Sequence, residues 1–280
     1  MVNLGTPFPL GRRKWHDPRN AAYAIGVRPK SALNSQSWAR RAPIFDQGSL
    51  GSCTGNAAAG WVGTDNSIRP GLAQVTYPAS LVGSGAPVTR PVDEDFAINV
   101  YGLATQLDAF AGTYPPTDTG SDGPSAAKAL TKLGLAGQYQ HAFSIAALQS
   151  ALQTGPVMWG TDWYNSMFDL DASGYLVVKK SSGLAGGHEL LITGWDKTSD
   201  VYVVTNSWGT GWGNQGTCRV KAKDMTTLLA QDGDLTQPVP VNAPVPPDPT
   251  PVPSVVTDAQ FIAAYQSFRQ VADAWASTRD

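Results

Sequence analysis

The feature that most constrains the fold is a change of pattern near Pro156. Before it, apolar residues recur at helical spacing, and small or capping residues mark the helix ends. After it, short runs rich in β-branched and aromatic residues are bounded by turns. Helices are predicted at 53–68, 94–110, 124–134 and 144–154, and strands at 156–163, 174–180, 188–196, 201–208 and 216–222. Helices followed by strands predict an α+β fold with two lobes.

Both ends of the chain differ from the predicted domain at 43–236. Residues 1–42 are rich in Arg, Pro and Asn with weak periodicity, which predicts an irregular arm that wraps a surface. Residues 237–256 are Pro-rich and predict an extended spacer. The segment 257–280 predicts a helix with one apolar stripe, formed by Phe261, Tyr265, Phe268, Ala272 and Trp275. This stripe is interpreted either as a surface that docks on the chain's own domain or as a surface for virion attachment or self-assembly.

Composition excludes several classes of function. The 280 residues carry a formal net charge of −2, which predicts no nucleic-acid partner. No apolar run approaches the roughly 18 residues that span a bilayer, so no membrane partner is predicted. The first residues lack the apolar core of a signal peptide, which predicts a cytoplasmic location on synthesis. No cluster of side chains has the spacing of a zinc site, so no metal is predicted.

Cys53 is one of only two cysteines, and it lies where the first predicted helix begins. A helix N-terminus and a nearby imidazolium lower the pKa of a thiol, and its thiolate is the nucleophilic form. The alternative is a small buried side chain of the core, since free cysteines are often buried. Cys218 lies in a predicted strand and is interpreted as a core residue. Upstream of Cys53, the amide of Gln47 is a candidate donor to an oxyanion, together with the Cys53 backbone N–H.

A candidate base lies far along the chain. His188 follows two glycines at the head of an apolar strand, in the sequence AGGHELLITGW. Asn206, in TNSWGTGWG, is a candidate to orient the imidazole, and Trp208 is a candidate to shield their contact. The order Cys, His, Asn and their separation agree with the arrangement known for papain-type enzymes.

The motifs DQGSLGSC, GGHELLITGW and NSWGTGWGNQG together resemble the papain family of cysteine peptidases over roughly residues 43–220. The resemblance implies a two-lobed fold, with a helical lobe that carries Cys53 and a β-barrel-like lobe that carries His188 and Asn206. It implies an endopeptidase that acts on proteins or peptides without a cofactor, with Gln47 in the oxyanion hole. It further implies substrate contacts at Asp122, Gly123, Gly187 and Trp208.

Some positions depart from the family pattern. Leu50 stands where secreted relatives have a disulfide cysteine, and Thr54 follows the nucleophile where an aromatic residue is usual. The short arm resembles compact papain-like peptidases of bacteria and actinobacterial phages. This predicts a phage protein tethered to the virion through the C-terminal helix. Two alternatives stay open: a structural or attachment virion protein whose triad is little used, and acyl transfer or deamidation by the same triad.

Overall fold

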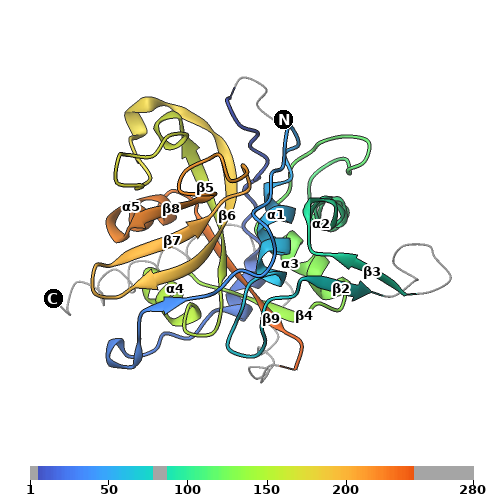
Figure 1. Ribbon diagram of the computed structural model, residues 1–280, viewed down its shortest axis with the longest axis horizontal. Helices are drawn as coiled ribbons and strands as arrows, with labels where there is room; N and C mark the ends of the chain where they lie inside the picture. The colour runs from blue at the N-terminus through green and yellow to red at the C-terminus, as the bar shows by residue number, and fades with distance from the viewer. Residues whose placement is uncertain (1–5, 78–86, 243–280) are drawn as a thin grey trace.

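The computed structural model describes residues 6–77 and 87–242. Two lobes lie side by side in Figure 1, one made of helices and the other built around a sheet. Each lobe has its own apolar core. The predicted α+β fold with two lobes is confirmed, and the N-terminal strand of the sheet lobe is added by the arm, at β1 (Gln36–Ser37).

The remaining bounds are as follows. The helices are α1 (Cys53–Val62), α2 (Glu94–Leu107), α3 (Gly123–Lys132), α4 (Ile145–Ala151) and α5 (Ala222–Leu229). The strands are β2 (Gln74–Tyr77), β3 (Val88–Pro91), β4 (Ala136–His141), β5 (Val157–Tyr164), β6 (Leu184–Asp196), β7 (Val201–Thr205), β8 (Thr217–Lys221) and β9 (Asp234–Pro240). Short 3₁₀ turns are η1 (Pro18–Tyr23), η2 (Lys30–Ala32), η4 (Asn165–Met167) and η5 (Lys180–Ser182).

Helix α1 is the buried centre of the helical lobe. All of its residues are buried, and α2, α3 and β6 pack around it. Small side chains on α1 suit this position, because they let neighbouring elements approach closely on several sides. The predicted helix extended to Ile68, but α1 ends at Val62. The carbonyl of Gly63 accepts the backbone N–H groups of Arg41 and Ala42 instead, so the chain turns away to meet the arm.

The sheet is antiparallel throughout, in the order β4-β9-β5-β6-β7-β8, with β1 added to β6. Its two end strands, β4 and β8, do not pair with each other, so the expected barrel-like lobe is an open sheet. Side chains alternate between faces along each strand. Met158 of β5 and Leu191 of β6, which are register partners, therefore pack in the core of the helical lobe, while Trp159 packs in the core of the sheet lobe.

Several segments differ from the prediction. Residues 174–180 form isolated bridges to Leu170 and Arg219 in place of a regular strand. Strands β2, β3, β4 and β9 and helix α5 were not predicted. Strand β9 continues to Pro240, so residues 237–240 belong to the sheet although the spacer was expected to begin there. The rest of the spacer from residue 243 and the stripe of Phe261, Tyr265, Phe268, Ala272 and Trp275 lie outside the described residues.

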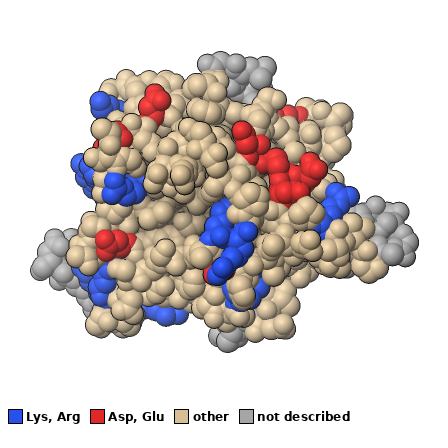
Figure 2. All heavy atoms as spheres, viewed as in Figure 1, with Lys and Arg blue, Asp and Glu red and all other residues tan. Residues whose placement is uncertain are grey.

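Charged side chains form separate small groups on the face shown in Figure 2, and neither sign covers it continuously. This agrees with the small net charge of −2. Within the described ranges, the helices lack the length and apolar character that a membrane crossing requires.

Candidate active site

Cys53 is the first residue of α1, directly after the N-cap Ser52, as its sequence context predicted. Its side chain is fully buried, with 0% exposure. Backbone N–H groups of Glu189, Gly11 and Thr54 face the sulfur. The N–H of Glu189 belongs to the peptide that joins His188 to Glu189, so the start of α1 meets β6 at the predicted base.

His188 lies in β6, and its Nε2 is 2.7 Å from Oδ1 of Asn206. Asn206 follows β7, and the same Oδ1 accepts the backbone N–H of Ser207 at 2.8 Å. Because an atom that accepts a backbone N–H is the amide oxygen, Nε2 of His188 must be the donor. In a neutral imidazole this leaves Nδ1 with its lone pair, the form needed for a base.

Trp208 lies between His188 and Phe8. Its ring stacks on the imidazole with centroids 4.5 Å apart and on Phe8 of the arm at the same distance. Trp163 contacts the imidazole edge-on at 5.0 Å. The indole thus covers one face of the imidazole, where the sequence predicts a shield, and Phe8 covers the indole in turn.

The electrostatic state of the pair differs from the expected one. Burial raises the pKa of Cys53 to about 12, the charge of Glu189 adds to this rise, and the facing N–H groups lower it. Burial lowers the pKa of His188 to about 4, although its bond to Asn206 raises it. Burial thus favours the neutral form of both groups in the covered site. Among the described residues, Nδ1 of His188 has no hydrogen-bond partner.

Gln47 is held by three contacts around its side-chain amide. Its Oε1 accepts the hydroxyl of Ser207 at 2.6 Å, which fixes the orientation of the amide. Its Nε2 donates to the carbonyl of Leu50 at 2.8 Å and faces the carbonyl of Pro9 at 3.5 Å. An arm carbonyl thus lies at the donor that was predicted to serve an oxyanion.

The arm explains why the sulfur is sealed. We call residues Phe8–Lys14 the cleft segment. Its backbone is bound from both lobes. The backbone N–H of Arg12 donates to the carbonyl of Gly187 at 3.0 Å, and the backbone N–H of Arg13 donates to the carbonyl of Ser121 at 2.7 Å. The N–H of Ser121 in turn donates to the carbonyl of Gly11 at 3.0 Å. These are the bonds that an extended peptide makes with a sheet edge.

Two of the four predicted substrate contacts touch the cleft segment. Gly187 binds it directly, and Trp208 packs on Phe8. Asp122 instead caps α3, where its Oδ1 accepts the N–H of Ser125 at 2.7 Å. The neighbouring Gly123 borders the carboxylate of Glu189, which the sequence analysis did not single out.

Four further residues at the site were not predicted from the sequence: Arg12, Asp162, Ser207 and Asp234. Arg12 Nε donates to Oδ2 of Asp234 at 3.1 Å, across 222 positions of sequence. Lys14 Nζ forms an ion pair with Oδ1 of Asp162 at 2.7 Å. The run of basic residues in the cleft segment was the available signal, but its acidic partners are single residues on distant strands.

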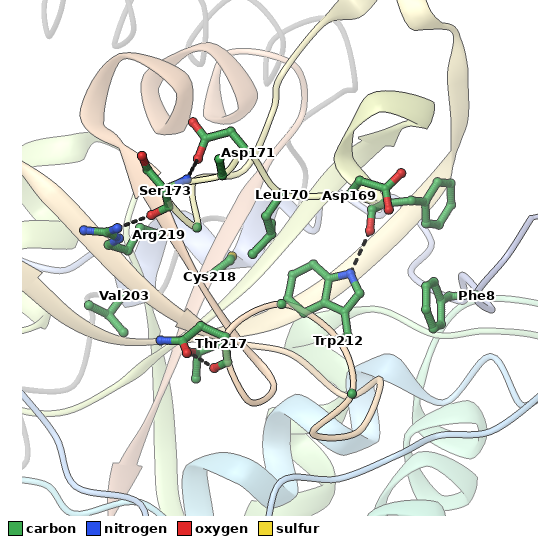
Figure 3. A pocket seen from close by; sticks show the side chains of 16 residues that line it. Phe8, Asp169, Leu170, Asp171, Ser173, Val203, Trp212, Thr217, Cys218 and Arg219 are labelled. Atoms are coloured by element: carbon green, nitrogen blue, oxygen red, sulfur yellow. Dashed lines mark hydrogen bonds between the residues drawn. The ribbon is translucent and has the colours of Figure 1, made fainter.

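A separate hollow on the sheet lobe is shown in Figure 3. Phe8 and Trp212 lie at one end of it, and Arg219, with its guanidinium near the carbonyl of Ser173, lies at the other. Gln47, Cys53, His188 and Asn206 do not line it. The two ranges that the structure describes also hold no cluster of His, Cys, Asp and Glu that fits a metal ion.

Residues 96–233 match the family model described as papain family cysteine protease. The match contains His188 and Asn206, and it begins after Gln47 and Cys53. Over 80 residues the chain is 36% identical to gamete and mating-type specific protein A of Dictyostelium discoideum. That match covers 28% of this chain and 17% of the relative, so the chain spans only a small part of the curated relative's length.

The fold is similar to those of several solved cysteine proteases. Xylellain from Xylella fastidiosa superposes with a TM-score of 0.57 at 17% identity, over 83% of this chain and 96% of the other. Digestive procathepsin L 3 from the larval midgut of Tenebrio molitor gives 0.51 at 14% identity, over 82% and 83%. A recombinant stem bromelain precursor gives 0.51 at 13% identity, over 79% and 76%. At these identities the likeness concerns the fold.

Proposed function

Because this chain belongs to the papain family of cysteine proteases, we propose that it hydrolyses peptide bonds with Cys53 as nucleophile, His188 as acid and base, and Asn206 as the orienting residue. One observation carries the proposal. The Cys53 sulfur faces the N–H of the peptide between His188 and Glu189, while Nε2 of the same histidine binds Asn206 at 2.7 Å. An oriented imidazole with a free Nδ1 lone pair, on the strand whose next N–H the helix-start thiol faces, is suited to nucleophilic catalysis.

The proposed steps are those of acyl transfer. The thiol proton of Cys53 passes to Nδ1 of His188, and the thiolate attacks the carbonyl carbon of the scissile bond. Nε2 of Gln47 and the backbone N–H of Cys53 stabilise the oxyanion. Collapse breaks the C–N bond, and His188 protonates the leaving amine. Water, deprotonated by His188, then hydrolyses the thioester and releases the free thiol and a carboxylate product.

The cleft segment must leave before this chemistry can start. It turns the Gly11 N–H toward the sulfur, places the Pro9 carbonyl at Gln47, and covers Trp208 with Phe8. Once water reaches the sulfur, the burial that keeps both groups neutral is relieved, and the facing N–H groups and the helix start favour the thiolate. The covered site is thus a resting form of the proposed enzyme.

The test is incubation of the full chain with a denatured protein mixture, followed by mass spectrometry of the new termini. The parent chain and a Cys218→Ala control are expected to generate new termini, because Cys218 is a buried residue of β8. Cys53→Ala is expected to generate none while keeping its circular dichroism spectrum. Equal cleavage by Cys53→Ala and the parent would remove the assignment.

We further propose that residues 257–280 tether the domain to a larger assembly, such as a virion, after synthesis in the cytoplasm. The support is in the sequence alone: a Pro-rich spacer followed by an apolar stripe of Phe261, Tyr265, Phe268, Ala272 and Trp275. Deletion from residue 243 removes this segment and keeps β9 intact. Loss of co-purifying partners or of self-assembly is expected, and an unchanged assembly state would reject tethering.

A further inference from the structure

We propose that an acidic pocket beside Cys53 selects substrates with an arginine or lysine next to the residue whose carbonyl is attacked. The pocket is formed by Glu189, Asp234 and Asp122, with Gly123 and Gly160 as its walls. This inference rests on the proposed function and adds a substrate class to it. The cleft segment provides the evidence, because it already inserts Arg12 there.

Arg12 makes the contacts expected of a bound basic side chain. Its Nε and Nη2 both donate to Oδ2 of Asp234, and Nη2 donates to the carbonyl of Asp232 at 2.7 Å. The Arg12 side chain is 1% exposed. A charge is buried to this extent only where opposite charges and hydrogen bonds compensate for the lost water.

The pocket also holds polar atoms that the arm leaves unused. Both carboxylate oxygens of Glu189 lack a hydrogen-bond partner in the described part of the chain, and this residue is 1% exposed. Oδ1 of Asp234 and Oδ2 of Asp122 also lack one there. An unpartnered carboxylate in a dry site is costly. These oxygens therefore indicate a binding site for a cation with several donors, which describes a guanidinium or an ammonium group.

Two glycines leave room for that group. A Cβ added at Gly160 would lie 2.7 Å from Arg12 Nε, 2.7 Å from Oε2 of Glu189 and 2.4 Å from Oδ2 of Asp234. A Cβ added at Gly123 would lie 2.6 Å from Oε1 of Glu189. Gly160 and Glu189 are register partners on β5 and β6, so any side chain at 160 would fill the space that the guanidinium occupies.

The charges in the pocket agree with a cation. Although burial by itself lowers the pKa of Arg12, the charges of Asp234 and Glu189 hold it above its usual value. Burial, and then the charge of Asp234, raise the pKa of Glu189 well above its usual value. Burial raises the pKa of Asp122 to about 6. A bound arginine or lysine relieves the repulsion between these carboxylates, and a neutral side chain does not.

The register along the cleft segment sets the position of the basic residue. Gly11 lies at the sulfur and leaves no room for a side chain, since a Cβ there would lie 1.8 Å from the carbonyl oxygen of Gly51. The next residue is Arg12, whose side chain enters the pocket. A peptide that places a carbonyl at Cys53 therefore offers the side chain of an adjacent residue to Glu189 and Asp234.

The first test profiles cleavage sites in a denatured protein mixture. The parent chain is expected to show arginine or lysine enriched next to the residue that bears the scissile carbonyl. Asp234→Asn combined with Glu189→Gln is expected to lower that enrichment, taken as the ratio of cleavage at basic sites to cleavage at neutral sites, by about ten- to a hundredfold. Asp169→Asn, an exposed residue away from the pocket, is the matched control. Cleavage without basic enrichment, or enrichment that survives in the double variant, overturns the inference and leaves the proposed function intact.

The second test does not need catalysis. In a Cys53→Ala chain that also carries Arg12→Ala, calorimetry measures binding of a peptide with the sequence of residues 8–14, and of the same peptide with citrulline in place of the first arginine. We expect about ten- to a hundredfold tighter binding of the arginine peptide. Arg12→Met, which keeps the buried stem, replaces Arg12→Ala if that variant does not fold. Equal affinities overturn the pocket assignment, even where the parent cleaves no peptide at all.

Discussion

Nε2 of His188 lies 2.7 Å from Oδ1 of Asn206, beneath the ring of Trp208. The same oxygen accepts the backbone N–H of Ser207, which fixes the amide and, through it, the tautomer of the imidazole. The hydrogen bond that orients the candidate base thus comes from a side chain on a different segment from the base itself.

Asn206→Ala should lower kcat by roughly 10- to 100-fold, because a hydrogen bond to an imidazolium contributes about 1.5–3 kcal/mol and each 1.36 kcal/mol is tenfold in rate. Peptidase assays at several pH values measure this change. Asn214→Ala, at an exposed position in the next turn, is the control and should retain its activity. An Asn206→Ala enzyme with the parent's kcat and pH profile contradicts the orienting role.

Arg12→Glu should eject the cleft segment, because it adds a carboxylate beside Asp234 and Glu189. The thiol of Cys53, whose pKa burial now raises to about 12, then becomes accessible. We expect alkylation of Cys53 by iodoacetamide at pH 7.5 to accelerate by at least about tenfold, since the thiolate is the reactive species. Peptide mapping measures the rate at this residue.

Arg13→Glu is the matched control for that experiment. It makes the same change of charge one residue later, where the guanidinium lies 4.0 Å from the ring centroid of Phe110, outside the pocket. Cys218, also buried, reports any general unfolding. Equal Cys53 reactivity in the two arginine variants would show that Arg12 does not hold the segment in the cleft.

Gly160→Ala should loosen the same segment without any change of charge. The new Cβ would lie within 2.7 Å of three polar side-chain atoms, so the pocket must widen or Arg12 must leave. We expect about 1–3 kcal/mol lower stability, as is typical of overpacking, together with faster alkylation of Cys53. Urea unfolding and peptide mapping measure the two effects. Gly26→Ala, where no atom lies within 4 Å of an added Cβ, should change neither.

His141 should make the stability sensitive to acid. It ends β4, its Nδ1 lies 3.4 Å from Oγ1 of Thr236, and burial lowers its pKa to about 4. An unfolded histidine has a pKa of about 6.5. The unfolded chain therefore binds a proton first, and the stability that neutral His141 contributes is complete above about pH 6.5 and falls as the pH drops to about 4.

His141→Gln removes this dependence. The difference in unfolding free energy between parent and variant should shrink by up to about 1.4 kcal/mol per pH unit between pH 6.5 and 4. Urea unfolding at a series of pH values measures the difference. A constant difference for His141→Gln contradicts the role given to its burial.

The features that were predicted correctly from the sequence are those that a few neighbouring residues determine. Ser144 was predicted to cap a helix, and it accepts the N–H of Ala147 at the start of α4. Cys53 was expected at a helix start and lies there. His188 and Asn206 were paired from their motifs alone, and they form a hydrogen bond. Each of these features depends on a few consecutive residues and on a fold that the motifs themselves indicate.

The missed features depend on distant partners. Strand β9 contains Pro238 and Pro240, which made it look like the start of the spacer. It pairs with β5 only over residues Asp234 to Thr236, so on that side the two prolines have no partner strand that needs an N–H donor, as at a sheet edge. The burial of Arg12 could not be predicted for the same reason, because Asp234 is 222 positions away and nothing near either residue marks the pair.

Ser207 contacts both the residue that orients the imidazole and the candidate oxyanion donor. Its backbone N–H binds Oδ1 of Asn206, and its hydroxyl binds Oε1 of Gln47 across the boundary between the lobes. A peptide that wedges the lobes apart therefore pulls on the oxyanion donor and on the imidazole's anchor at the same time. The oxyanion donor and the amide that orients the imidazole therefore share one anchor, and a substitution at Ser207 would disturb both.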